Sequence, residues 1–401
     1  MEPVKEELSQ KPALSRSLLL LMSIAGAVSV ANLYDSQPLL AGLAQYFHVS
    51  SAVIGVAAML TQIGNAIGLI FLVPFGDIVR HRLLIITMLA CSMAALSGLS
   101  FASSILWFAV GSLLVGITSI TQILLVTLAA HLADPASRGR VIGTVMTGLL
   151  FGMLLSRTFS GIVGEHWGWR AVYRIAAVMM GILIVVFYFR LPRSSPGSSM
   201  SYGKLLASLG GLLRRQPVLR SSSLIGAMMF ATFSAFWATL SFLLESPAYR
   251  LGAQAAGMFG LLGTAGALAA SAAGRVSDRK GPLFTLTIGI CLSMASFLCL
   301  WIFGTRMQGL ICGIILLDLG VQTAQISNQA KINALDAASR SRNNAIYMAL
   351  YFVGGALGSF LGSYFWGLFG WTGVCALGVA FQGIAAAAHF REFGHALHTQ
   401  K

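Results

Sequence analysis

Three charged side chains lie inside stretches that are otherwise almost wholly apolar: Asp35, Arg157 and Asp318. An ionisable side chain is costly to hold in such surroundings, so each is a candidate for a functional role. Measured from Arg16 and Arg140 at about 1.5 Å per helical residue, Asp35 and Arg157 lie at a similar depth, roughly 26–28 Å along their helices. Two opposite charges at one depth are candidates for a common site.

Asp318 lies roughly 16 Å into its apolar stretch, with no basic residue nearby in the same helix. A carboxylate without a cationic partner at that depth favours its protonated form, which suits a proton carrier. The alternative is a permanently neutral Asp318 that hydrogen-bonds between helices. The two interpretations differ in whether the proton exchanges.

These residues must be positioned by membrane-spanning helices. Of the 401 residues, 57% are hydrophobic and only 9% are charged, a composition that excludes an ordinary water-soluble domain. A hydrocarbon core of about 30 Å needs roughly 20 apolar residues per helix. Breaks at charged, Pro and Gly residues predict an all-α membrane protein with twelve spans: 17–43, 51–74, 83–103, 105–132, 141–164, 170–190, 218–244, 254–275, 283–303, 307–331, 343–369 and 371–390.

The distribution of Lys and Arg predicts the orientation of the spans. Most of the 26 basic residues fall in the loops on the side of the two termini, and the other side has only Arg170, Arg174, Arg250 and Arg306. Because basic loops stay in the cytoplasm, we expect a multi-pass protein with both termini cytoplasmic. The net charge of +14 reflects this loop bias, so we expect no nucleic-acid partner.

The sequence divides into two halves joined by a polar segment. Residues 191–217 begin rich in Ser, Pro and Gly and continue as a basic amphipathic stretch, which predicts a linker along the anionic inner leaflet or, alternatively, a partner-binding segment. An offset of 202 residues aligns Gly152 with Gly354 and Gly168 with Gly370. This repeat predicts two six-helix bundles in parallel. The predicted units are an N-terminal bundle with a cytoplasmic tail at 1–16, a linker and a C-terminal bundle: 1–190, 191–217 and 218–401.

Several segments resemble the major facilitator superfamily. The segment Gly274–Gly281 (GRVSDRKG) is similar to the superfamily signature between the second and third helices of each half, and the copy at 74–82 keeps its Asp and its basic end. Together with 31–34 (ANLY) and 168–170 (GWR), these segments resemble a bacterial branch of drug:proton antiporters and arabinose-efflux-like exporters. The resemblance implies the major facilitator fold, with twelve transmembrane helices in two bundles.

The resemblance also implies two charged sites. It places the first and fifth helices side by side, so Asp35 and Arg157 are expected to form a salt bridge. The pair would be a coupling switch if substrate or a proton breaks it, or else a structural pair near the outer interface with Arg157 reaching to water. In the superfamily, charged clusters in the basic loops are thought to latch the cytoplasmic gate in the outward-facing state. The residues expected to do so are Asp77, Arg82, Asp134, Arg138, Asp278, Arg279, Asp336 and Arg340.

Polar and aromatic side chains on the apolar spans are candidates for lining a central substrate cavity. For any one of them, helix packing is the alternative role. Those expected at the cavity are Asn32, Gln37, Gln122, Phe236, Trp237, Gln325, Asn328, Tyr347 and Tyr351.

The resemblance implies a monomeric secondary active transporter of the bacterial inner membrane that moves a small organic solute by alternating access, with protons and the lipid bilayer as its other partners. Proton-coupled efflux of a drug or metabolite is the leading hypothesis, and proton-coupled uptake is the alternative. Ser112 and Ser156 stand where drug antiporters of the superfamily usually have Arg and Gly, which keeps open a non-transporting sensor or lipid-handling protein. No phosphate-binding loop, catalytic carboxylate pair, Ser/His/Asp pattern or metal-ligand cysteine spacing is present, so we expect no enzyme activity, cofactor or metal.

Overall fold

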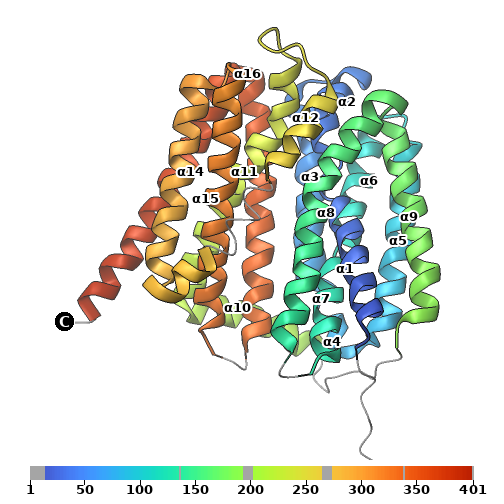
Figure 1. Ribbon diagram of the computed structural model, residues 1–401, viewed down its shortest axis with the longest axis vertical. Helices are drawn as coiled ribbons and strands as arrows, with labels where there is room; N and C mark the ends of the chain where they lie inside the picture. The colour runs from blue at the N-terminus through green and yellow to red at the C-terminus, as the bar shows by residue number, and fades with distance from the viewer. Residues whose placement is uncertain (1–13, 135–136, 193–201, 264–272, 337–338, 400–401) are drawn as a thin grey trace, which may run out of the picture.

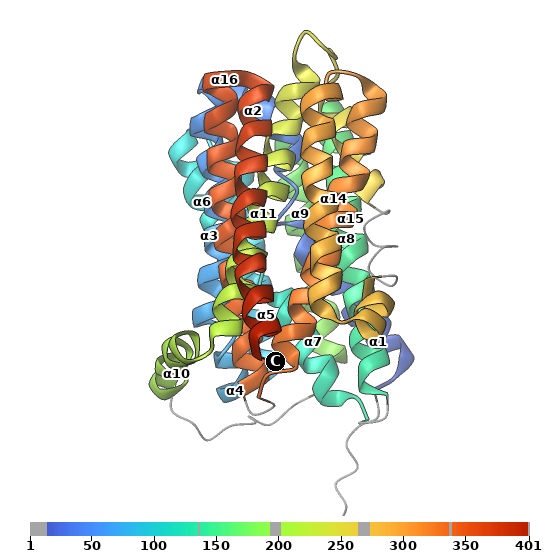
Figure 2. The same ribbon diagram turned by 90° about the vertical axis from the view of Figure 1, so that its left-hand side faces the viewer.

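The computed structural model describes residues 14–134, 137–192, 202–263, 273–336 and 339–399, and nearly all of them are helical. The long helices stand side by side, with α14, α15 and α16 on the left and α1, α5, α8 and α9 on the right, and α1 begins at the same end of the molecule at which the chain finishes (Figure 1). We call this end the basic side and the opposite end the distal side. α10, Tyr202–Arg215, lies across the basic side rather than along the bundle (Figure 2).

Each half contributes its own set of helices. The first half contains α1 Arg16–Ala31, η1 Gln37–Leu39, α2 Leu40–Tyr46, α3 Ser51–Phe71, α4 Phe75–Ile78, α5 His81–Ser100, α6 Ile105–Thr118, α7 Thr121–Leu132, α8 Arg138–Trp167 and α9 Trp169–Arg190. The second half contains α11 Pro217–Glu245, α12 Ala253–Phe259, η2 Gly260–Gly263, α14 Pro282–Phe303, α15 Met307–Asn333 and α16 Arg340–Thr399.

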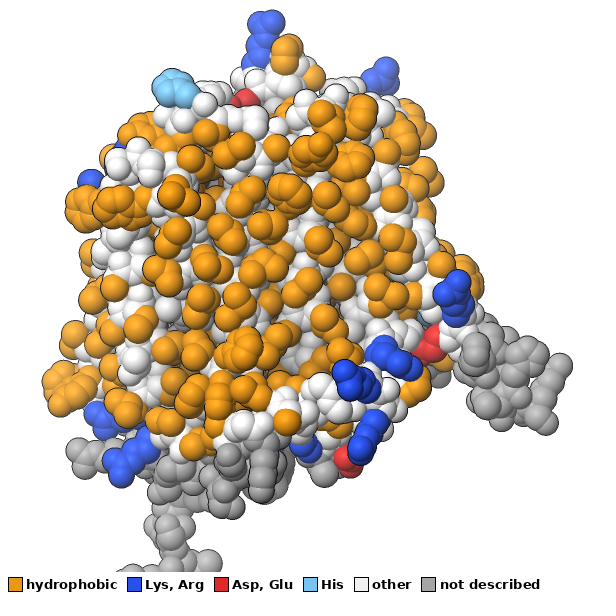
Figure 3. Space-filling view, turned by 180° about the vertical axis from the view of Figure 1, so that it is seen from behind, with side chains coloured by type: hydrophobic (Ala, Val, Ile, Leu, Met, Phe, Trp, Pro, Cys, Tyr) orange, Lys and Arg blue, Asp and Glu red, His pale blue; other side chains and the backbone are white. Residues whose placement is uncertain are grey.

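The helices have the length and surface of membrane spans. Within the described residues, nine helices are long and apolar enough to cross a membrane. One of them, α16, changes direction at Gly370 and therefore contains two spans. On the face seen in Figure 3, apolar side chains cover the middle, and Lys and Arg gather toward the two ends. The predicted all-α membrane fold of two six-helix bundles is confirmed.

The sequence repeat corresponds to repeated helix packing. Gly152 of α8 packs against the backbone of Ala27 in α1, and the aligned Gly354 of α16 packs against the backbone of Ala227 in α11. A Cβ at either glycine would collide with the facing backbone, so close approach requires glycine at both positions. The first and fifth helices of each half therefore meet in the same way.

The turn into the sixth helix of each half also repeats. Gly168 (φ 80°) and Gly370 (φ 58°) both adopt positive φ, which favours glycine. After Gly168, the guanidinium carbon of Arg170 lies 4.3 Å from the ring centroid of Trp169. Arg170 also donates a hydrogen bond of 2.9 Å to the carbonyl oxygen of Ala102. This segment ties the start of α9 to the turn between α5 and α6.

The first predicted span is not one continuous helix. α1 ends at Ala31, residues 32–36 form turns, and η1 and α2 complete the crossing. The amide nitrogens of Tyr34 and Asp35 bond locally to the Ala31 carbonyl oxygen, at 2.8 and 3.0 Å. Non-helical backbone at this depth is tolerated because the turn is buried in protein. Hydropathy predicted the position of the span but not the break within it.

Two other spans also differ from continuous helices. The fourth predicted span, 105–132, is interrupted between α6 and α7. The eighth, 254–275, begins as α12 and tightens into the 3-10 helix η2 at Gly260, and its part from 264 to 272 lies outside the described residues. Interrupted helices at membrane depth are typical of substrate sites in transporters.

Candidate functional site

A central cavity of about 270 Å³ lies between the two halves. Its walls come from the end of α1, the turn after it, and α7, α8, α11, α15 and α16, and most of the lining residues are apolar. The described lining residues include no formally charged side chain. The polar ones are Tyr34, Gln122, Gln322, Gln325, Gln329 and Tyr351. The cavity is therefore apolar with a few amide and hydroxyl groups, a composition typical of small-molecule sites.

The two halves are joined on the distal side of this cavity. Hydrogen bonds that cross the boundary there include Gln45 to Glu245 at 2.8 Å, Ser51 to the Ser363 carbonyl oxygen at 3.0 Å, and Thr158 to the Gly257 carbonyl oxygen at 3.0 Å. Gly161 of α8 also packs directly against Gly257 of α12. Hydrogen bonds and backbone contact therefore hold the two halves together on the distal side.

Arg157 lies at the distal end of the cavity, one helical turn beyond Met153 in its wall, and is 0% exposed. Its Nε donates a hydrogen bond of 2.8 Å to Oε1 of Gln37 in η1. Its guanidinium carbon lies 4.0, 5.1 and 5.3 Å from the ring centroids of Trp237, Tyr34 and Phe233. Nη1 and Nη2 have no hydrogen-bond partner among the described residues. Aromatic rings therefore surround the guanidinium while most of its donors stay available.

Asp318 is the acidic side chain that interacts electrostatically with Arg157. It lies on α15 in the second half, is 2% exposed, and its Oδ2 has no hydrogen-bond partner within the described chain. The two side chains do not form a direct ion pair. A Cβ at Gly263 would lie 3.4 Å from Oδ2 of Asp318, and one at Gly260 would press on Arg157. The interrupted segment η2 therefore packs against both charged groups, as η1 does against Arg157.

The expected salt bridge between Asp35 and Arg157 is not formed, and that prediction is wrong. Asp35 is buried in the turn after α1 and interacts electrostatically with Tyr173 of α9. It borders a separate crevice of about 260 Å³ between α1, α8 and α9. Because α1 ends at Ala31, the backbone after it no longer follows a helical rotation, and Gln37 faces Arg157 instead.

Three of the residues expected at the cavity line it: Gln122, Gln325 and Tyr351. The Tyr351 hydroxyl donates a hydrogen bond of 3.2 Å to Oε1 of Gln325, which links α16 to α15. Tyr351 also stacks on Phe230, with ring centroids 4.1 Å apart. Gln37 and Trp237 do not reach the cavity, and contact Arg157 instead.

The remaining expected cavity residues lie elsewhere. Asn32 borders the crevice that contains Asp35. Phe236 is buried and packs edge-on against Trp237. Tyr347 and Asn328 are both buried and adjoin each other between α15 and α16. Phe236, Tyr347 and Asn328 therefore pack between helices in this structure.

Several lining residues were not expected from the sequence, among them Tyr34, Phe230, Met146, Met153 and Gln329. The sequence did carry a signal for the glutamines among the lining residues. Glutamines at 322, 325 and 329 follow helical spacing on one face of α15, and all of them line the cavity. The apolar members carry no such signal, because a methionine or phenylalanine in a span has the same appearance whether it faces a cavity, lipid or another helix.

The charged side chains expected to latch the cytoplasmic gate lie in and beside the loops of the basic side. Within the described part of the chain, Asp134, Arg138, Asp278, Arg279 and Arg340 form no ion pair. Arg82 donates instead to the carbonyl oxygen of Tyr188 in α9. The side chain of Asp77 lies outside the described part. The aligned Asp134 and Asp336 do form equivalent turns, because their carbonyl oxygens accept from the amides of Ser137 (2.9 Å) and Ser339 (3.2 Å). A latch was expected for the opposite arrangement, in which the basic side closes.

The sequence and the fold identify the family. Residues 19–335 match the Major Facilitator Superfamily, and the chain belongs to it. It is 38% identical over 380 residues to "Uncharacterized transporter YgaY" of Escherichia coli O157:H7, covering 95% of this chain and 96% of that protein. It is 32% identical over 368 residues to "Probable transporter SCO4007" of Streptomyces coelicolor, covering 91% and 85%. The protein is therefore a multi-pass membrane transporter and not an enzyme.

Solved structures share the fold at low sequence identity. A bacterial homolog of the human lysosomal transporter Spinster, in an inward-facing and occupied conformation, aligns with a TM-score of 0.74 at 15% identity, covering 94% of this chain and 97% of that one. A mutant of the nucleoside transporter NupG aligns with a TM-score of 0.72 at 14% identity, covering 94% and 99%. These likenesses show the major facilitator fold over 94% of the chain.

Proposed function

We propose that this protein is a monomeric, proton-coupled exporter of a small organic solute across the bacterial inner membrane. The basic side would face the cytoplasm, as the loop charges indicate. The halves 1–190 and 218–401 would rock about the central cavity, exposing it to each side in turn. The observation that carries the proposal is the pair of buried charges, Arg157 and Asp318, which lie at the cavity's distal end without a direct ion pair.

The position of these charges suits coupling because each belongs to a different half. A charged Asp318 attracts Arg157 across the boundary, and a proton on Asp318 removes that attraction. The protonation state of Asp318 therefore biases how closely α8 and α15 approach each other. Movement of the halves changes the surroundings of Asp318 in return, which is the reciprocal linkage that coupled transport requires.

The cavity supports an uncharged, amphipathic solute. Its amide side chains can donate and accept hydrogen bonds, while its apolar walls favour a molecule with substantial apolar surface. A solute with a full charge would have to leave water for a lining without a formally charged partner among the described residues. The volume of about 270 Å³ fits a compact organic molecule rather than a peptide or a lipid.

Flux measurements in proteoliposomes test the proposal. Purified protein is first screened for neutral solutes that raise its unfolding temperature, and the best solute is then followed under an imposed pH gradient. We expect accumulation of the solute on the acidic side, opposite to proton flow. Asp318→Asn should abolish gradient-driven accumulation but keep solute exchange, whereas Asp35→Asn, a matched buried carboxylate outside the Arg157 site, should keep both.

Each alternative has its own outcome. Accumulation on the alkaline side would show uptake together with protons. Exchange that ignores the pH gradient in the wild type, or an Asp318→Asn variant with intact coupling, would refute the proton role. Solute binding without any flux would show a protein that has kept the fold and lost transport.

A further inference from the structure

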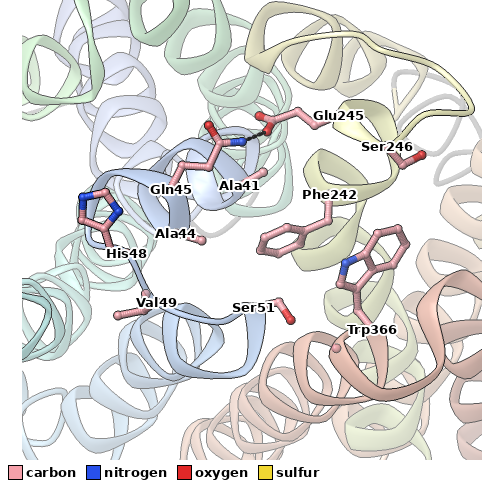
Figure 4. Close-up of a pocket in the computed structure, with 11 residues that line it drawn as sticks. Ala41, Ala44, Gln45, His48, Val49, Ser51, Phe242, Glu245, Ser246 and Trp366 are labelled. Atoms are coloured by element: carbon pink, nitrogen blue, oxygen red, sulfur yellow. Dashed lines mark hydrogen bonds between the residues drawn. The ribbon is translucent and has the colours of Figure 1, made fainter.

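A second pocket, of about 570 Å³, lies on the distal side where the two halves meet. It is separate from the central cavity, with which it shares no lining residue. Figure 4 shows its opposite walls. The first half supplies Ala41, Ala44, Gln45, His48, Val49 and Ser51, and the second half supplies Phe242, Glu245, Ser246, Trp366 and Gly367.

One wall of this distal pocket is aromatic. The rings of Phe242 in α11 and Trp366 in α16 stack with centroids 6.1 Å apart and an interplanar angle of 27°. Both are only partly buried, and their side chains border the open space in Figure 4. Aromatic faces carry a negative quadrupole potential, so a pair of them forms a surface that attracts cations as well as apolar groups.

A carboxylate stands beside this aromatic wall. Oε2 of Glu245 accepts a hydrogen bond of 2.8 Å from Nε2 of Gln45, as Figure 4 shows. That bond crosses from α2 to α11 and fixes the carboxylate at the rim. Glu245 lies only three residues after Phe242, so the negative charge and the ring share one face of α11.

A second carboxylate makes the site more negative. Glu165 of α8 is close enough to Glu245 to repel it electrostatically. Its Oε2 accepts from the backbone amide of Gln254 at 3.3 Å. Neither glutamate forms an ion pair within the described residues. Two like charges held near each other without a cation leave an electrostatic cost that a bound cation would relieve.

We propose that the distal pocket binds an organic cation of the quaternary ammonium class. The ammonium group would lie between the Glu245 carboxylate and the faces of Phe242 and Trp366, with its alkyl groups on the apolar walls. Because the walls belong to both halves, the bound cation favours the arrangement that is closed on the distal side. This site is independent of the central solute cavity and of its proton coupling.

Calorimetric titration of the purified full-length protein tests the site with three probes. Tetraethylammonium and choline are the cations, and 3,3-dimethyl-1-butanol is the uncharged isostere of choline. We expect saturable binding of both cations and none of the alcohol. Glu245→Gln keeps the size of the side chain and should weaken cation binding about tenfold, while Trp366→Leu should weaken it about fivefold, as expected for a lost cation–π contact of about 1 kcal/mol.

Asp318→Asn is the control, because its carboxylate adjoins the central cavity. Binding that persists in Asp318→Asn and falls in both pocket variants supports the proposal, provided that thermal unfolding shows all variants folded. Binding lost in Asp318→Asn but unchanged in Glu245→Gln would place the cation in the central cavity and overturn the assignment. Equal binding of the alcohol, or no saturable cation binding by the wild type, would also overturn it.

Discussion

Gly257→Leu should open the distal side of the protein. Gly257 of α12 packs against Gly161 of α8 and also accepts the hydrogen bond from Thr158. A Cβ at Gly257 would press on the backbone of Arg157, and backbone atoms cannot rotate away as a side chain can. Overpacking of this kind costs about 1–3 kcal/mol. The cost falls only on the closed arrangement, because the two glycines belong to different halves.

A change of about 1–3 kcal/mol corresponds to a shift of about 5- to 150-fold in the ratio of closed to open molecules. Spin labels on cysteines at Gly42 and Ala248, which are exposed on the distal side of opposite halves, would report it as a distance distribution. The wild type should give mostly the shorter distance. Gly257→Leu should transfer a large share of the population to a longer one.

The matched control is Gly98→Leu, another helical glycine of the same chain. A Cβ at Gly98 meets nothing within 4 Å, so this variant should leave the distal distances unchanged. A Gly257→Leu variant with the same distances as the wild type would refute the reasoning, since it would mean that the α8–α12 contact yields without separating the halves.

Four further outcomes are expected. Arg157→Lys should lose transport although it keeps the charge, because an ammonium cannot stack flat on Trp237 as a guanidinium can, and flux assays would detect this. Arg170→Ala should lower the free energy of unfolding by about 1–3 kcal/mol through lost hydrogen bonds and ring contact, measured by thermal denaturation in detergent. Gly370→Ala should destabilise by about 1–3 kcal/mol because a side chain strains its positive φ. Asp35→Asn should leave the pH dependence of flux unchanged, since Asp35 does not meet Arg157.

The sequence predicted the features that depend on composition and on the repeat. Span positions follow from hydropathy, because a helix in lipid must be apolar over a fixed length. The repeat pairs Gly152 with Gly354, and both pack on the first helix of their own half. It also pairs Gly168 with Gly370, and both take positive φ at the same turn. In these cases one local requirement, small size or backbone freedom, selects the residue directly.

The sequence could not predict the details of the charged site. Depth along a helix gives a height in the membrane, but each residue also rotates the side chain by about 100° around the axis. Counting residues placed Asp35 and Arg157 at one height, yet they face different neighbours, and the turns at 32–36 change the rotation further. The hydropathy of the sequence reveals neither the turn nor the rotation. The partner of Arg157 in η1, Gln37, was expected at the cavity for its polarity alone.

The surroundings of Arg157 explain how a charge can be held there without a direct ion pair. A direct ion pair would satisfy the guanidinium but would also bind the halves together at that point, and separating it would leave two uncompensated buried charges. Groups from both halves stabilise the guanidinium instead. Tyr34 and the Gln37 amide belong to the first half, and the Trp237 ring belongs to the second. Under the proposed coupling, Asp318 can then change its charge without first breaking an ion pair to Arg157. Substitution of Trp237 should therefore make transport more sensitive to the charge of Asp318. A double-mutant cycle that compares the flux of Trp237→Leu, Asp318→Asn and the double variant would measure this dependence as non-additivity.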